Sequence, residues 1–564
     1  MLWHARDKSP VFDEIGHLQA GYYHWEHKDF ERGLEHPPLL RLWAALPLQF
    51  MNLTDPEALY PLFLQKPLSV TREQLYGTML IYRDPNVSPE KIVFAARLMM
   101  IAVTLLLLWV LFAWSRDLYG LSGGLLSLFL GATFPPFLGH GSIVNTDVGG
   151  AAFGLLFLYA LSRLLHEPSL RNLVYCGFIL GLAQASKLSN VVLFPIAFVL
   201  TVLYPGVAGK KHSVRVLYFL ALAVASALVL NACYRFQDFI PPHGIHPNDL
   251  QVYQWSAFTQ FLYRWAPLPD FYLLSLGFLS HHLKSGFSTF LLGKTYSQGV
   301  WYYFPVLFLV RTPTVALLSI FAAFYSLKKL VPERREFILI FSAAAYILTA
   351  LFSKLNLGIR HFLFVYPLLF IFCGRLAFWK DFLLPGKSWA IGLGLFHILE
   401  VAWISPHYLT FYNLISGGPR AGRFYSSDLD YGQDLKRLGL FMKKYPGAEL
   451  VLSYFGTALP EAYGIGAQEL LPAGTLIHTD QVNSDHPSRE FLAVSVSQIQ
   501  GLMTGEGTLG WLKSRKPAEV LGYSIYVYDI TRDRDAHERL AKIYREAGDA
   551  RKSEHHLRRA RSIS

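Results

Sequence analysis

Long apolar segments separated by short polar loops occupy the middle of the chain. A helix that crosses the hydrocarbon core of a bilayer needs about 20 apolar residues. Two of the apolar segments are shorter than this, and Arg311 and Pro313 interrupt a third. The pattern predicts a polytopic α-helical membrane protein with about ten or eleven transmembrane helices. The predicted spans are residues 93–114, 121–139, 147–165, 172–186, 188–204, 214–232, 303–327, 337–353, 361–379 and 388–404.

Polar and mixed segments precede and interrupt the predicted transmembrane region, residues 93–404. Residues 1–92 form a predicted first external loop, which carries the acidic pair Asp13 and Glu14 and then the stretch HPPLLRLWAALPLQF. Two prolines suit the start of a helix. Apolar residues around a single arginine predict a juxtamembrane helix lying in the bilayer interface, with a helix of a soluble domain as the alternative. Residues 233–302 form a second, aromatic-rich external loop.

The pattern changes at about residue 405. The stretches AELVLSYF, EFLAVSVS and YSIYVYDI alternate or stay apolar over the length of a strand, so residues 405–530 predict an external α/β domain. Residues 531–564 resemble one tetratricopeptide unit with Gly548 at its turn. One such unit cannot bury its apolar face alone. We expect it either to pack on the domain or to form a solvated, charged helix.

Composition narrows the classes of protein. The chain has 564 residues, of which 52% are hydrophobic and 16% are charged. This excludes a disordered chain, a coiled coil and an ordinary soluble enzyme. Three cysteines exclude a disulfide-framed scaffold and a cysteine-rich zinc module. The net charge of +11 includes no basic run with interleaved aromatics, so membrane lipids and not nucleic acid are the expected partners.

Lysine and arginine in the short loops predict the orientation. If alternate loops are assigned to one side, that side holds 13 of these residues and the other side holds 3, namely Lys187, Lys354 and Arg360. Cytoplasmic loops carry the excess of positive charge. We therefore expect residues 1–92, 233–302 and 405–564 to face the outside, in a bacterium the periplasm, with the protein in the inner membrane.

The first external loop would have to cross the membrane, yet residues 1–12 contain no charged and then apolar leader. We expect a first transmembrane helix upstream of this sequence.

Charged residues cluster where the predicted spans meet the outer side. Charges at this depth are costly, so each one invites a functional interpretation. A carboxylate there can deprotonate an acceptor hydroxyl or bind a divalent metal ion, and arginine or lysine can hold phosphate. Together these groups suit transfer from a phospholipid-linked donor. The candidates are Asp13, Glu14, Glu35, His36, Asp147, Lys187, Lys354, Arg360 and His361.

Other interpretations stay open. Each charged residue alone can be a snorkelling or headgroup contact. The chain can also be a transporter or flippase for a lipid-linked sugar, or a catalytically silent receptor or scaffold. A flippase needs polar residues along a path through the bilayer, whereas the middles of these spans are mostly Leu, Ile, Val, Phe and Ala. The motifs HExxH and GxxxxGK[ST] are missing from the sequence, so zinc peptidase and P-loop chemistry lack support.

Several segments resemble, in order, those of one family. They are SPVFDEIGHLQAGYYHWEHKDFERGLEHPPLLRLWAALPL, VNTDVGGAAFGLLF, GLAQASKLSNVVLFP, LLGKTYSQGVWYYFPVLFLVRTPTVALL, NLGIRHFLFVYPLLFIFCGRLA and ISPHYLTFYNLISGGP followed by SSDLDYGQDLKRL. The family is the GT-C glycosyltransferases of the protein mannosyltransferase and aminoarabinose transferase superfamily, in a bacterial branch described as phospholipid-carrier-dependent. The resemblance covers residues 9–530.

The resemblance implies a GT-C fold with its site at the outer face. It also implies a polyprenyl-phosphate sugar as donor, a hexosyl or pentosyl transfer, and inversion at the anomeric carbon. Asp13 matches the catalytic acidic position, with Glu14 beside it, and Asp147 matches the second acidic position. The residues implied for the donor phosphate are Lys187, Arg360, His361 and Arg311, the last in place of a lysine.

Two further points follow from the resemblance. Glu35 and His36 stand where some relatives have Glu-Lys before the proline pair, so they are candidates for a divalent metal site. The external domain differs from that of the better-known members. The acceptor is therefore open between a protein, a lipid and a cell-envelope glycan.

Overall fold

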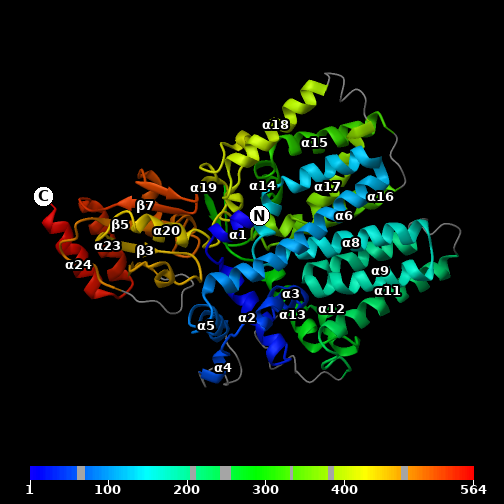
Figure 1. The fold of residues 1–564 in the computed structure, drawn as a ribbon, viewed down its shortest axis with the longest axis horizontal. Coiled ribbons are helices and arrows are strands. Elements are labelled where there is room, and N and C mark those ends of the chain that lie inside the picture. Colours follow the sequence, from blue (N-terminus) through cyan, green and yellow to red (C-terminus); the bar gives the residue numbers. More distant parts are fainter. Residues whose placement is uncertain are drawn as a thin grey trace.

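A large helical region and a smaller C-terminal domain built on a sheet lie at opposite ends of the molecule, with the N-terminus between them (Figure 1). Among the charges used to predict the orientation, Lys210, Arg334 and Lys380 lie outside the described residues. The computed structural model describes residues 1–59, 70–203, 211–241, 256–330, 335–378, 387–471 and 481–563.

The first loop is mostly helical and links the two ends of the molecule. Its helices are α1 (Leu2–Asp7), α2 (Phe12–Glu26), α3 (Leu39–Ala45), α4 (Pro56–Leu59) and α5 (Val70–Tyr82). Helix α3 begins directly after the proline pair, as the sequence predicts, and packs against α2. The backbone N–H groups of Ser9 and Phe12 donate to the carbonyls of Gln433 and Tyr431 at 3.0 and 2.8 Å. These bonds attach the first loop to the C-terminal segment.

Helices of the apolar region follow, interrupted by one short hairpin, β1 (Thr289–Leu291) with β2 (Lys294–Tyr296). Glycines let α9 and α11 approach closely, because a Cβ on Gly177 would lie 2.6 Å from the side chain of Ala225. The helices are α6 (Pro89–Ala132), α7 (Pro135–His140), α8 (Asp147–His166), α9 (Leu170–Ser186), α10 (Leu193–Phe198), α11 (His212–Cys233), α12 (Ala257–Trp265), α13 (Asp270–Ser285), α14 (Tyr303–Arg311), α15 (Thr314–Tyr325), α16 (Glu336–Phe352), α17 (Val365–Cys373) and α18 (Lys387–Trp403).

Length and composition allow three helices of the described residues to cross a membrane, namely α6, α8 and α11. The pair Tyr303–Arg311 and Thr314–Lys328, bent by 115°, is a fourth if it forms one span. The bend falls at the interruption that the sequence shows in the segment 303–327. The other predicted spans fall on helices of 17 residues or fewer. The helical fold class is thus confirmed, whereas the count of ten or eleven spans stays a prediction.

Helix α6 contains the predicted span 93–114 and most of the predicted span 121–139, because the chain reverses within it. Tyr119 and Gly120 leave the helical conformation, and Gly120 has a φ of 66°, which favours glycine. The hydroxyls of Ser115 and Ser127 then lie 2.7 Å apart across the turn. Residues 89–118 and 121–132 therefore run as an antiparallel pair.

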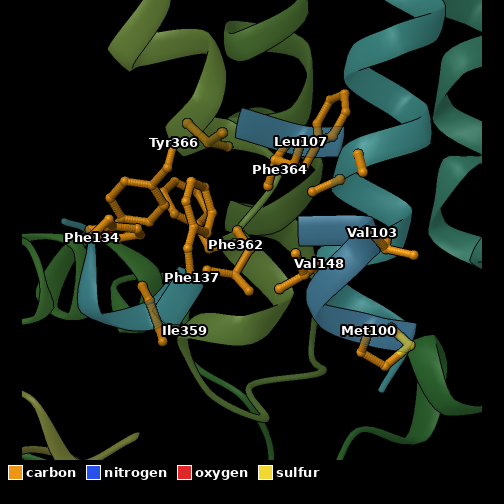
Figure 2. Packing of buried hydrophobic residues seen from close by; sticks show 14 of the residues in the cluster. Met100, Val103, Leu107, Phe134, Phe137, Val148, Ile359, Phe362, Phe364 and Tyr366 are labelled. Atoms are coloured by element: carbon orange, nitrogen blue, oxygen red, sulfur yellow. The ribbon is translucent and has the colours of Figure 1, made fainter. Parts of the chain in front are cut away.

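The core of the helical region positions the segment that carries Arg360. Figure 2 shows aromatic side chains of α7, α17 and the turn before α17 gathered together, with Ile359 at their edge. The ring of Phe134 lies 4.3 Å from that of Tyr366 and 4.9 Å from that of Phe137. Each such pair adds about 0.5–1.5 kcal/mol beyond the burial of its area. The 3₁₀ turn η7 (Ile359–Phe362) is thereby anchored on its apolar side.

The C-terminal domain is built on a five-stranded mixed sheet of order β4-β3-β5-β7-β6. Strand β3 pairs in parallel with β4 and β5, and β7 is antiparallel to β5 and β6. Strands β3, β5 and β7 fall in the three stretches that predicted strands. The strands are β3 (Glu449–Ser453), β4 (Gln468–Glu469), β5 (Glu490–Ser495), β6 (Glu519–Leu521) and β7 (Ile525–Asp529), and the short helices α19 (Gly422–Tyr425), α20 (Leu435–Met442), α21 (Val496–Ile499) and α22 (Glu506–Leu509) accompany them.

The tail forms two helices, α23 (Arg534–Glu546) and α24 (Ala550–Ser562), joined at Gly548, whose φ is 83°. It packs on the sheet, because the Tyr544 hydroxyl donates to the carbonyl of Glu469 at 2.8 Å and Leu540 is fully buried. Of the two alternatives for this segment, the structure has the packed one.

Candidate active site

A cavity of about 520 Å³ lies between the first loop and the ends of several helices of the apolar region. Its walls come from α2, α8, α13, α16, the 3₁₀ turn η3 (Leu188–Val192) and η7. Seven of the ten residues that the sequence proposes for the site line this cavity, while Glu14, Arg311 and Lys354 do not. The seven are Asp13, Glu35, His36, Asp147, Lys187, Arg360 and His361.

Asp13 and Arg360, 347 positions apart in the chain, form an ion pair in the cavity wall. Asp13 stands in the first turn of α2, and its side chain keeps 30% of its surface exposed. Gly358, with a φ of 106°, sets the backbone before η7, and the Arg360 guanidinium lies 5.3 Å from the ring centre of Tyr431. Burial opposes ionisation of Asp13, but the Arg360 guanidinium holds its pKa below the usual range. Asp13 is therefore ionised at neutral pH.

Asp147 and Lys187 form a second pair, with Nζ 2.6 Å from Oδ1. Asp147 begins α8, where its backbone N–H donates to Asn145 Oδ1 at 2.9 Å, and Lys187 directly follows α9. A Cβ on Gly150 would lie 2.8 Å from the Lys187 side chain. The glycine one turn after Asp147 therefore makes room for the lysine to reach that carboxylate.

Glu14 is fully buried and turned away from the cavity. Its carboxylate accepts from Arg97 Nε at 2.9 Å and from Arg97 Nη2 at 2.5 Å. It also accepts from the backbone N–H groups of Val11 and Val144 at 2.9 and 2.8 Å. The bonds from Arg97 and Val144 hold the first loop against α6 and the segment before α8, and the bond from Val11 closes the first turn of α2. The geometry therefore gives Glu14 a structural place and does not support the catalytic role that the resemblance implies for it.

Arg311 is also fully buried and outside the cavity. Its Nη2 donates to the carbonyl of Leu409 at 2.9 Å and lies 3.7 Å from Asp428 Oδ2, and its guanidinium lies 4.8 Å from the Tyr412 ring centre. The 115° bend after α14 directs this side chain toward the segment that follows α18. A phosphate contact, the role implied for Arg311, is not supported by this placement.

Glu35 and His36 line the cavity, but they do not form a three-ligand metal centre. Glu35 Oε2 accepts from Arg41 Nη2 at 3.2 Å, and His36 Nδ1 lies 3.5 Å from Thr146 Oγ1. Among the described residues, three clusters of His, Cys, Asp or Glu have ligand atoms close enough for one ion, and neither residue belongs to them. The metal site predicted at Glu35 and His36 therefore lacks a third ligand in this geometry.

Four further charged or histidine side chains line the cavity and are not among the residues proposed from the sequence, namely His17, Arg41, Glu73 and His282. His17 lies four positions after Asp13 on α2, a spacing that could have placed both on one face. Burial, followed by the charge of Arg41, lowers the pKa of His17 to about 3, so its ring is neutral. Burial, followed by the charge of Glu35, raises the pKa of Glu73 to about 7. No local pattern marks Glu73, which reaches the cavity only because α5 packs on α2.

One known protein family matches part of this chain in sequence. Residues 90–279 match the family model described as dolichyl-phosphate-mannose-protein mannosyltransferase. No curated protein matches the chain in sequence.

Two solved structures of ArnT from Cupriavidus metallidurans align with the chain, one in the apo state and one bound to undecaprenyl phosphate. They are 13% and 12% identical to it, and each alignment covers 94% of this chain and 95% of the other, with a TM-score of 0.46. The family match over residues 90–279 supports the resemblance inferred from the sequence motifs, and over this part the chain is similar to the protein mannosyltransferases.

Proposed function

We propose that this protein is a membrane glycosyltransferase that moves a sugar from a polyprenyl-phosphate donor to an acceptor on the non-cytoplasmic face of the membrane. One observation carries the proposal. Asp13, Asp147, Lys187, Arg360 and His361 come from segments far apart in the chain, yet they line one cavity of about 520 Å³. That size is typical of a small-molecule site, and the groups are those that the reaction needs.

The cations suit the phosphate of the donor. Arg360 offers a planar fork of N–H donors and Lys187 offers a point charge, and phosphate accepts from both. His361 lies beside them in the same wall. Arg360 is already paired with Asp13, and Lys187 with Asp147. An incoming phosphate therefore competes with these two carboxylates for the two cations. We infer that donor binding draws Arg360 away from Asp13.

Asp13 is then the base. It takes the proton of the acceptor hydroxyl or amine as that group attacks the anomeric carbon. The bond from this carbon to the phosphate oxygen breaks, and the polyprenyl phosphate leaves with the electron pair. Lys187 and Arg360 stabilise the negative charge on the leaving phosphate. Attack from the face opposite the phosphate inverts the anomeric carbon.

The apolar part of the cavity wall suits the lipid of the donor. Phe278, Leu279, Leu283 and Phe287, from α13 and the residues after it, line the same cavity as the cations. A prenyl chain packed along this wall would place its phosphate near Arg360. Glu35, Arg41 and Glu73 lie in the wall and are candidates for contacts to the sugar or the acceptor.

Purified full-length protein in vesicles, given a labelled polyprenyl-phosphate hexose or pentose, tests the proposal. Release of polyprenyl phosphate and loss of the donor are expected with one of the two sugars, and Arg360→Gln should slow this about 100-fold. The matched control is Arg558→Gln, which removes an exposed arginine on α24. Movement of the intact donor across the bilayer would indicate a flippase instead. Neither consumption nor movement with either donor would contradict the proposal and favour a scaffold.

A further inference from the structure

A second hollow, of about 740 Å³, lies on the C-terminal domain, between α20 and the hairpin of β6 and β7. It shares no lining residue with the first cavity. We call it the basic hollow. Its charged and histidine side chains are His407, Arg420, Arg423, Arg437, Lys444, Lys516 and Glu519.

Most of the positive charge in the basic hollow is unneutralised. Arg437 is used in an ion pair with Asp7, at 2.7 Å. Among the described residues, no carboxylate forms an ion pair with any of the other four cations. A hollow lined mainly by positive charge, here five Lys and Arg side chains against the one carboxylate of Glu519, concentrates anions. The four cations are Arg420, Arg423, Lys444 and Lys516.

The floor of the basic hollow is fixed by the fold. A Cβ on Gly522 would lie 2.1 Å from the Asp434 carboxylate, so the hairpin can approach α20 this closely only with glycine at its tip. Ser524 Oγ donates to Asp434 Oδ2 at 2.7 Å, and the rings of His407 and Tyr523 lie 5.8 Å apart. The Arg423 guanidinium lies 4.7 Å from the ring centre of Phe424 and 5.8 Å from that of Tyr526. These contacts hold the shape of the hollow before any ligand binds.

Exposed apolar side chains come from the same stretch of chain, residues 403–424, as three side chains of the basic hollow, His407, Arg420 and Arg423. The apolar helix α18 ends at Trp403, which is 59% exposed. Ile415 is 71% exposed and Phe424 is 51% exposed. A Cβ on Gly418 would lie 3.2 Å from the Trp403 ring, so the segment that carries these residues packs on the end of α18. Aromatic and apolar residues in such a place sit at the level of lipid headgroups.

We infer that the basic hollow binds the phosphate of an anionic membrane lipid, whose chains lie along the exposed apolar residues Trp403, Ile415 and Phe424. Charge complementarity calls for phosphate, and the neighbouring apolar surface calls for an amphiphile and not a free ion. The inference does not rest on the proposed transfer reaction, because no residue of the basic hollow belongs to the first cavity.

Binding of a short-chain phosphatidic acid to the full-length protein in neutral detergent tests the inference. Tight binding is expected for phosphatidic acid and none for short-chain phosphatidylcholine. The double variant Arg420→Gln/Lys516→Gln should weaken binding by about tenfold for each cation removed. The matched control, Lys443→Gln/Lys542→Gln, removes two exposed lysines of the same domain outside the hollow and should bind as the parent does.

Three outcomes would overturn the inference. Equal weakening in the control variant would mean that the overall charge of the domain attracts the lipid. Competition by inorganic phosphate as strong as that by phosphatidic acid would mean that the hollow takes a free anion. Absence of phosphatidic acid binding to the parent protein would remove the site altogether. A failure of sugar transfer would leave this binding unchanged, so the two proposals fail separately.

Discussion

The first cavity and the basic hollow hold similar cations in opposite ways. In the cavity, Arg360 pairs with Asp13 and Lys187 pairs with Asp147. In the hollow, Arg420 and Lys516 have no such partner among the described residues. Pairing fixes a cation in place but makes a ligand compete for it, whereas an unpaired cation is available but less precisely held. The comparison suggests that the cavity is built for chemistry at defined atoms and the hollow for anion binding.

The largest effect is expected from Asp13→Asn. If Asp13 is the base, its loss should slow sugar transfer by about 100- to 10,000-fold. Because the side chain is partly exposed, the protein should still fold and bind the donor. Consumption of a labelled polyprenyl-phosphate sugar measures the rate. Asp485→Asn, on an exposed residue of the C-terminal domain, serves as control. Full activity of the Asp13 variant would mean that the cavity, like the basic hollow, is not shown to hold a catalytic group.

Glu14→Gln should lower the stability of the protein, whereas Asp13→Asn should lower the rate of sugar transfer. The change leaves the buried Arg97 without its anionic partner, and breaking a buried ion pair costs about 3–5 kcal/mol of unfolding free energy. Thermal unfolding in detergent measures the loss, with Glu538→Gln on the surface of α23 as control. An unchanged unfolding temperature together with lost transfer would instead place Glu14 in the reaction.

Glu73→Gln should change how stability depends on pH. Burial raises the pKa of Glu73 from 4.5 to about 7, so the folded state favours the protonated form. Its stabilising contribution is complete below pH 4.5 and is lost as the pH rises to about 7. Relative to the variant, the parent should lose on the order of 1–2 kcal/mol over that window, after allowance for partial exposure. Unfolding temperatures measured across the window test this, and parallel curves for the two proteins would contradict it.

The smallest effect is expected from Lys516→Gln in the basic hollow. An exposed cation without an ion-pair partner contributes less than about 0.5 kcal/mol to stability. The unfolding temperature should stay the same, while the affinity for phosphatidic acid falls. In the cavity, Lys187→Gln should lower the unfolding temperature, because the variant leaves the buried Asp147 unpaired. Equal destabilisation by both variants would show that pairing does not separate the two regions.

Much of the architecture was predictable from local pattern. The proline pair marks the start of α3, and three apolar stretches mark the strands β3, β5 and β7. Charged residues near the ends of predicted spans marked seven of the cavity residues. The reversal inside α6 was also visible in the sequence as a polar gap between two apolar segments. The turn falls in this gap, at Gly120, which has a positive φ.

The candidate site was less predictable where neighbours in sequence diverge in space. Asp13 and Glu14 form one acidic pair in the sequence, but successive residues of a helix point about 100° apart. One therefore faces the cavity and the other faces Arg97. Arg311 ends an apolar helix much as a phosphate-binding residue would, yet the bend after α14 turns it toward Tyr412.

The sequence by itself determined which segments are apolar enough to bury and where charge gathers along the chain, because hydrophobicity and helix periodicity are local properties. Only the tertiary structure decided which carboxylate meets which cation. Asp13 reaches Arg360 across 347 positions, and the basic hollow brings together cations from residue 420 to residue 516 of the chain. Such encounters depend on the packing of whole elements against one another, and no local pattern records that packing.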